Sequence, residues 1–208
     1  IIFRVLPEYA TRLVELETGG VDLMESIQIA DADRLAQEHP EIDLRISTNN
    51  NRVEILREGL DMAIRFGTGG WTGHEAIPLI EAPLAPLCAP ALTSRLLVPA
   101  DLAQLTLLRS YRSAEWKVWF EAAGADCPPL TGPVFDSSVA LAELAASGAG
   151  AALLPVAMFE SWIAQGRLSQ PFGVAVSMGR YYLAWPSDRR ASPAMSVFSN
   201  WLSGKNAS

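Results

Sequence analysis

The sequence contains little of what metal sites and disulfide frameworks require. Among its 208 residues are two cysteines and two histidines, with no CxxC pair. Structural zinc sites use four such ligands, and small exported domains use several bridges, so we expect neither a metal site nor a disulfide framework. We interpret Cys88 and Cys127 as two reduced thiols in a cytoplasmic protein; the alternative is one bridge in an exported protein. No cofactor is expected.

Positive charge and long hydrophobic runs are also scarce. Lys and Arg total 16 against 23 Asp and Glu, so the formal net charge is −7. Gripping phosphates requires the opposite sign, so we expect no direct contact of this chain with DNA or RNA. The longest apolar run, residues 148–159, contains Pro155 and is too short to span a membrane. The first residues also lack the basic and then apolar pattern of a signal peptide.

Apolar and amphipathic segments alternate along most of the chain. Half of the residues are hydrophobic, which is enough for a core. Helical patterns at residues 29–38 and 52–58 alternate with strand patterns at 42–47 and 60–66, which favours parallel pairing through crossover helices. Further strands are predicted at residues 105–111, 134–135, 150–155 and 183–185, and further helices at 113–123, from the Asp-Ser-Ser cluster through Ala146, and at 192–202.

This alternation predicts an α/β protein of two Rossmann-like subdomains. Subdomain I is expected to comprise residues 1–81 together with 183–208, and subdomain II residues 84–180. Because the chain would cross twice between them, we expect a hinge and a cleft, which is a common place for a small ligand.

A polar cluster, Asp136-Ser137-Ser138, stands between a short strand and a helix. Asp and Ser are typical helix caps, because they bind the free N–H groups of the first turn. The same helix end carries partial positive charge and could bind a carboxylate or phosphate. The pattern does not choose between a cap alone and a cap that also anchors a ligand.

Polar residues beside other predicted strands are further candidates for ligand contact. Arg109 and Arg112 could form a guanidinium fork for an acidic ligand, or could be solvated turn residues. Thr48 and Asn49 follow a strand, where ligands bind in open α/β sheets, but they also suit a turn. Tyr181, before the late strand, could place a hydroxyl in the cleft or could simply pack.

A catalytic serine is the enzyme alternative, and the sequence offers no partner for it. A nucleophilic Ser137 or Ser138 would need a base, and the histidines lie beside Pro40 and in a glycine-rich loop. The G-x-S-x-G and Ser-x-x-Lys patterns are missing around the cluster. We therefore expect a binding protein rather than an enzyme.

Several stretches together resemble one known family. They are HPEIDLRISTNNNRVEILREGLDMAIRFGTGGW, PLCAP, LLRSYRSAEWKVWFEAAG, VFDSSVALAE and SPAMSVFSNWL. This set, spread over residues 29–204, resembles the effector-binding domain of LysR-type transcriptional regulators, and most of all those that control inducible chromosomal β-lactamase. LRSYR..EW and VFDSS are its most specific parts.

The resemblance implies a periplasmic-binding-protein-like fold of type 2 and a cytoplasmic homodimer formed through this domain. The implied effectors are peptidoglycan-derived muropeptides: anhydro-muropeptides that activate and a UDP-MurNAc-pentapeptide that represses. Ser138 and Tyr181 match pocket positions of these regulators. Glu54 stands at a position where they have aspartate, and it is expected to affect the switch between states more than ligand contact.

The chain departs from the family pattern at its N-terminal side. Residues 1–28 do not match, and ETGGVDLMES replaces the Gly-Thr loop that lines the family's pocket. The family's winged helix-turn-helix is also absent, so we expect DNA contact only through an N-terminal domain outside this chain. An exported solute-binding protein of the same fold is the alternative function.

Overall fold

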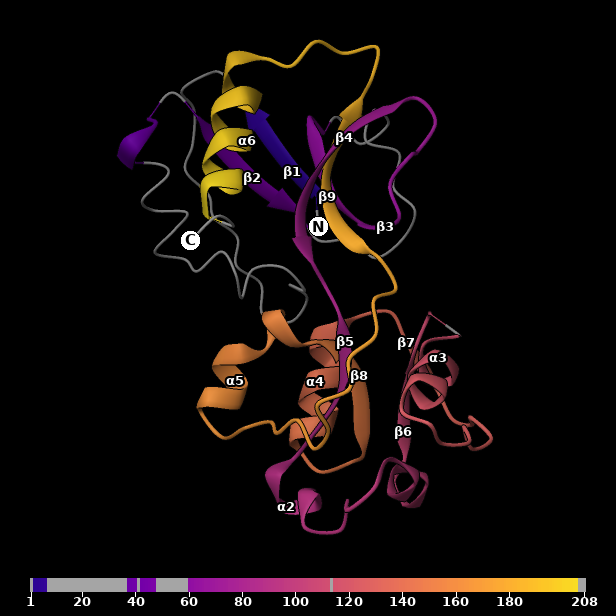
Figure 1. Cartoon of the computed structure of the whole chain (residues 1–208). Coiled ribbons are helices and arrows are strands. Elements are labelled where there is room, and N and C mark those ends of the chain that lie inside the picture. The colour runs from indigo at the N-terminus through magenta and orange to yellow at the C-terminus, as the bar shows by residue number, and fades with distance from the viewer. Residues whose placement is uncertain (1, 7–36, 41, 48–59, 113, 206–208) are drawn as a thin grey trace. The chain divides into compact units, whose positions relative to one another are not determined.

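The computed structural model describes residues 2–6, 37–40, 42–47, 60–112 and 114–205 (Figure 1). The chain divides into two compact units. Unit 1 comprises residues 1–81 and 179–208, and unit 2 comprises residues 82–178. The sequence had placed the two crossings at residues 81–84 and 180–183.

Unit 1 is built around a five-stranded sheet with the strand order β2-β1-β3-β9-β4. Its strands are β1 (Ile2–Leu6), β2 (Asp43–Ser47), β3 (Met62–Gly67), β4 (His74–Glu81) and β9 (Arg180–Pro186). Every described neighbouring pair in this sheet is antiparallel.

The prediction of parallel pairing for the first strands is therefore wrong. It assumed that β2 and β3 would be neighbours. Instead β1 lies between them and runs opposite to both, so β2 and β3 share a direction without sharing hydrogen bonds. Alternation of helices and strands predicts direction correctly here, but it does not predict which strand is inserted between two others.

A glycine-rich segment, residues 68–73, connects β3 to β4. Both strands are antiparallel to β9, which lies between them. Strand β3 ends beside Arg180 and β4 begins beside Pro186, so the segment must run back along the length of β9. A side chain at Gly69, where φ is +80°, would place its Cβ 3.0 Å from the ring of Tyr182. Trp71 packs edge-to-face on the same ring, with 5.4 Å between the ring centroids. Glycine therefore allows the segment to pass close to the sheet.

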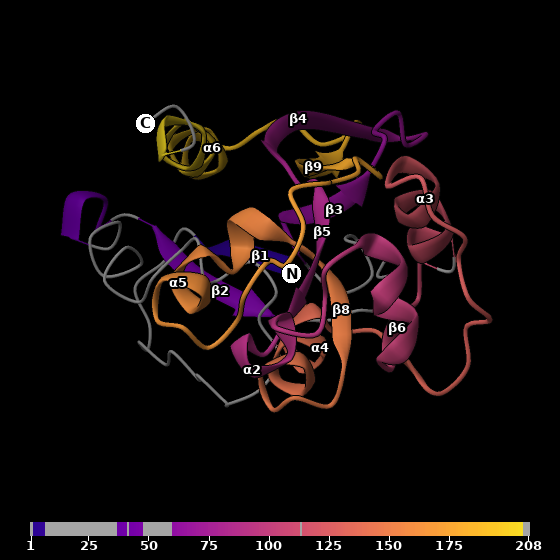
Figure 2. The ribbon, with the colours of Figure 1, turned by 60° about the horizontal axis from the view of Figure 1, so that its bottom comes forward.

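The last helix, α6 (Pro193–Lys205), also belongs to unit 1 and contacts β1. It is seen nearly end-on in Figure 2. The hydroxyl of Ser192 accepts a hydrogen bond from the Met195 amide at 3.2 Å, and Pro193 occupies the first turn. This is the cap predicted from the sequence.

Unit 2 contains a four-stranded sheet with the order β5-β8-β6-β7. Its strands are β5 (Leu84–Cys88), β6 (Leu107–Ser110), β7 (Val134–Phe135) and β8 (Ala151–Pro155). Strand β6 pairs in parallel with both β7 and β8, whereas β5 and β8 are antiparallel. The helices are α2 (Pro90–Thr93), the 3-10 helices Pro99–Gln104 and Val156–Met158, α3 (Glu115–Ala122), α4 (Ser138–Ala146) and α5 (Glu160–Ala164).

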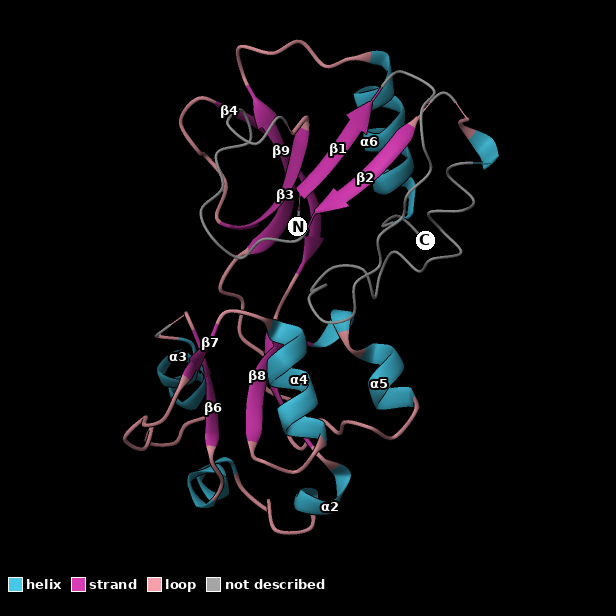
Figure 3. Ribbon diagram, turned by 180° about the vertical axis from the view of Figure 1, so that it is seen from behind, coloured by secondary structure: helices cyan, strands magenta, loops and turns pink. Residues whose placement is uncertain are grey.

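Helices cover both faces of this sheet. Figures 1 and 3, seen from opposite sides, both show α4 beside β8 on one side of the sheet and α3 beside β6 on the other. All five residues of β8 are buried, and Ala151 and Leu153 share a core cluster with Trp116, Trp119 and Phe120 of α3. A strand buried on both faces explains the continuous apolar run, which was predicted as a buried strand.

Candidate functional site

The polar cluster lies at the edge of unit 2 where parallel strands end. Ser110, the last residue of β6, pairs with Phe135, the last residue of β7, and the Tyr111 amide donates to the Phe135 carbonyl at 3.1 Å. Asp136 and Ser137 follow directly and lead into α4. Ligands of open α/β sheets bind at this carboxyl edge, so the structure brings two of the predicted segments to a suitable place.

The start of α4 separates the roles of the two serines. Ser137 is the N-cap, with extended backbone angles of −113° and 124°, and its hydroxyl accepts from the Ala140 amide at 3.3 Å. Ser138 is the first residue of the helix and is buried, while Asp136 is exposed. The capping hydroxyl is therefore that of Ser137 and not that of Ser138. The N-terminal end of α4 carries a partial positive charge, which suits an anionic group.

Both candidate arginines make contacts within unit 2. Arg109 donates through Nη1 to the Gly132 carbonyl at 2.9 Å, which ties β6 to the loop before β7. Arg112 donates through Nε to the Glu115 carboxylate at 3.0 Å, and through Nη1 to the Tyr111 hydroxyl at 3.2 Å. The Arg112 and Glu115 side chains are only 10% and 2% exposed. The ligand role of these arginines stays a prediction.

Glu115 is a residue that sequence reasoning missed. Its second carboxylate oxygen accepts from the Ser110 amide at 3.3 Å, and the Ser110 hydroxyl accepts from the Arg112 amide at 3.0 Å. A buried carboxylate needs such partners to offset its desolvation. The signal that could have found it is the spacing of three residues between an arginine and a glutamate at a helix start.

The other predicted residues lie elsewhere. Tyr181 belongs to β9 of unit 1, is buried, and packs edge-to-face on Phe66 with 5.2 Å between ring centroids. Thr48, Asn49 and Glu54 fall outside the described residues, so their roles stay predictions.

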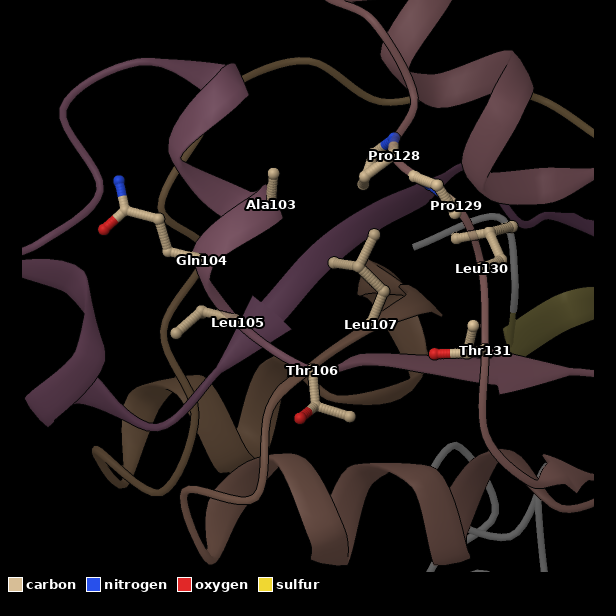
Figure 4. Close-up of a pocket in the computed structure, with 9 residues that line it drawn as sticks. All are labelled: Ala103, Gln104, Leu105, Thr106, Leu107, Pro128, Pro129, Leu130 and Thr131. Atoms are coloured by element: carbon tan, nitrogen blue, oxygen red, sulfur yellow. The ribbon is translucent and has the colours of Figure 1, made fainter.

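A pocket of about 340 Å³ in unit 2 lies away from this cluster. It is lined by residues 103–107 and 128–131 (Figure 4). Figure 4 shows Leu107 directed toward the segment from Pro128 to Leu130, with the Gln104 amide pointing away. Leu107 begins β6 and Ser110 ends it, so the pocket is at the opposite end of that strand from the polar cluster.

The two cysteines and the possible metal ligands in the described part of the chain do not meet what reactive thiol sites and metal sites require. Cys88 and Cys127 are both free thiols. Burial raises the pKa of Cys88 to about 11. It also raises the pKa of Cys127, where Lys117 acts in the opposite direction. Neutral thiols are poor nucleophiles. Within the described ranges, no group of three or more His, Cys, Asp or Glu side chains could hold a metal ion.

A family model described as the LysR substrate binding domain matches residues 32–207. The chain belongs to this family. Its fold is the two-subdomain α/β fold that the sequence predicted. Solved effector-binding domains of the family have the same fold. The effector domain of AmpR from Pseudomonas aeruginosa matches with 46% identity and a TM-score of 0.84, covering 89% of this chain and 91% of that one. The AmpR effector-binding domain from Citrobacter freundii matches with 40% identity and a TM-score of 0.83, covering 88% and 92%.

Curated relatives of this LysR domain are longer proteins. The transcriptional activator AmpR of Rhodobacter capsulatus is 81% identical over 171 residues, which are 82% of this chain and 59% of that protein. AmpR of Pseudomonas aeruginosa is 52% identical over 166 residues, 79% of this chain and 56% of that protein. The chain thus spans little more than half the length of these relatives. They are named as regulators and not as enzymes, in agreement with the prediction that this chain is not an enzyme. Among the described residues, no helix combines the length and the apolar character needed to cross a membrane.

Proposed function

We propose that this chain is the effector-binding part of an AmpR-type LysR regulator that senses peptidoglycan-derived muropeptides in the cytoplasm and thereby controls β-lactamase expression. The observation that carries the proposal is 81% identity to an AmpR over 82% of the chain. Another relative, from Enterobacter cloacae, is named as the transcriptional activator of a carbapenem-hydrolysing β-lactamase. These names favour a regulator over the exported solute-binding alternative.

The chemistry of the α4 edge supports this ligand class. A muropeptide carries several carboxylates and sugar hydroxyls. The N-terminal end of α4 carries a partial positive charge that suits a carboxylate, and Ser138 lies in that first turn. Tyr181 of unit 1 is the second proposed effector contact. A solved variant of the Citrobacter freundii domain replaces one threonine, one serine and one tyrosine by residues that lack the hydroxyl.

The same proposal includes the assembly of the full regulator. We propose that this domain forms a homodimer, and that DNA is contacted only by an N-terminal winged helix-turn-helix outside this chain. The formal net charge of −7 supports the second point, because an acidic surface repels phosphates.

The test is isothermal titration of the chain with a UDP-MurNAc-pentapeptide and with an anhydro-muropeptide. We expect saturable binding of at least one, and an affinity about fivefold weaker in Ser138→Ala, which is the effect of losing one hydrogen bond. Ser147→Ala is the matched control, since Ser147 caps the other end of α4 and its hydroxyl donates to Leu144. Absence of binding by a folded wild-type sample would rule out the muropeptide assignment. Equal affinities of wild type and Ser138→Ala would remove Ser138 from the site.

A further inference from the structure

Tyr111 is an aromatic side chain that unit 2 leaves exposed. The residue is 58% exposed, whereas Trp116, Trp119 and Phe120 of the adjacent α3 are at most 1% exposed. A single exposed aromatic residue is common on protein surfaces and carries no argument by itself. Tyr111 differs from such residues because Arg112 contacts both its ring and its hydroxyl.

A buried ion pair fixes the orientation of the Tyr111 ring. The guanidinium of Arg112 lies over the ring, 5.0 Å from its centroid, and its Nη1 donates to the ring hydroxyl at 3.2 Å. Arg112 is in turn held by the almost fully buried carboxylate of Glu115. The exposed ring is therefore connected, through the Arg112 guanidinium, to a carboxylate that is buried in unit 2.

The position of this ring adds a second observation. The Tyr111 amide is hydrogen-bonded to Phe135, the residue before Asp136 and the α4 cap Ser137. The oriented ring thus belongs to the same edge of unit 2 as the helix N-terminus proposed to take a carboxylate. An aromatic group held in place beside a polar anchor is a common arrangement in small-molecule sites.

We propose that Tyr111 is an effector contact on which a pyranose ring of the ligand packs. One face of a pyranose presents C–H groups, and these pack against an aromatic ring while the hydroxyls stay in water. A ring that is oriented before binding loses little conformational freedom, so more of the contact contributes to affinity. This inference rests on the proposed function, because the muropeptide supplies both the sugar and the carboxylates.

The test compares Tyr111→Ala with wild type by titration against an anhydro-muropeptide and against its stem peptide without sugar. We expect Tyr111→Ala to bind the anhydro-muropeptide at least about fivefold more weakly, as truncation of a packed aromatic contact does. Affinity for the stem peptide should be unchanged. Leu97→Ala is the matched control, because Leu97 is an apolar side chain of unit 2 with 83% exposure, and it should bind the anhydro-muropeptide like wild type.

A second variant separates the ring from its hydroxyl. Tyr111→Phe keeps the ring and removes the oxygen that accepts from Arg112, so it should lose clearly less affinity for the anhydro-muropeptide than Tyr111→Ala. Equal losses in both variants would overturn ring packing and identify the hydroxyl as the contact. An affinity of Tyr111→Ala equal to that of wild type would overturn the inference and leave the proposed function standing. A wild-type protein that is folded and binds neither ligand would overturn the proposed function, and this inference with it.

Discussion

At the scale of single residues, two ion pairs of unit 2 have similar lengths and very different surroundings. Arg112 and Glu115 are 3.0 Å apart with side chains 10% and 2% exposed, while Arg167 and Glu143 are 3.0 Å apart with 40% and 57% exposed. Removing one partner of a buried pair leaves a charge in a poorly solvated place, whereas an exposed partner is solvated by water.

We therefore predict different costs for the same substitution at these two sites. Glu115→Ala should lower the free energy of unfolding by about 3 kcal/mol, since it removes the buried carboxylate that pairs with Arg112 and accepts from the Ser110 amide. Glu143→Ala, the matched control, should cost less than about 1 kcal/mol. Denaturant unfolding of the two variants measures both values. Similar losses in the two variants would contradict the prediction.

The same residues show how far sequence reasoning reaches at this scale. The Asp-Ser-Ser cluster before an apolar run was enough to predict the start of α4, because capping is a local interaction. Which of the two serines is the cap was not predictable, since it depends on the residue at which the helical backbone begins. From the sequence, Arg112 is a possible guanidinium fork for a ligand. Its partner Glu115 is recognised only in the structure, where α3 begins at Glu115 and the carboxylate is buried.

At the scale of elements, β6 and β8 approach each other closely at Gly150. The Ala151 amide donates to the Thr106 carbonyl at 3.0 Å, and a Cβ added to Gly150 would overlap that carbonyl oxygen. Thr106 precedes β6 and Gly150 precedes β8, so this contact is where their parallel pairing begins. Glycine is required because backbone packs on backbone.

Gly150→Ala should consequently destabilise unit 2 by about 2 kcal/mol, because the strands must shift apart to admit the methyl group. Gly173→Ala is the control: its Cβ would meet nothing within 4 Å, so no loss of stability is expected. Thermal unfolding of both variants checks the difference. A Gly150→Ala variant as stable as Gly173→Ala would show that the approach of the strands is looser than described.

In unit 2, β6, β7, β8, α3 and α4 were predicted from the sequence, but β5, α2 and α5 were not. Strand pairing in unit 1 was predicted wrongly. The run at residues 150–155 is apolar throughout, which a strand buried on both faces requires. Pairing in unit 1 depends on β1, which lies between β2 and β3. Its place follows from contacts between residues about 40 and 60 positions apart in the sequence, which local patterns do not contain.

At the scale of the whole molecule, the two units differ in how the chain builds them. Unit 2 is one continuous segment, residues 82–178, with its own sheet and core. Unit 1 needs two segments, because β9 comes from the end of the chain and lies between β3 and β4. Removing β9 would separate the sheet into parts and leave β4 without its described neighbour.

We predict from this asymmetry that residues 82–178 alone unfold cooperatively, whereas a chain ending at Met178 loses the fold of unit 1 and keeps that of unit 2. A domain with a continuous chain and its own core can fold independently, and a sheet without its inner strand loses hydrogen bonds and apolar burial together. Hydrogen exchange measures this directly. In the truncated chain, amides of β3 and β4 should exchange rapidly, while those of β5, β6 and β8 should stay protected as in the full chain. Protection of β3 and β4 after truncation would mean that the first segment folds without β9, and loss of protection in β8 would mean that unit 2 depends on unit 1.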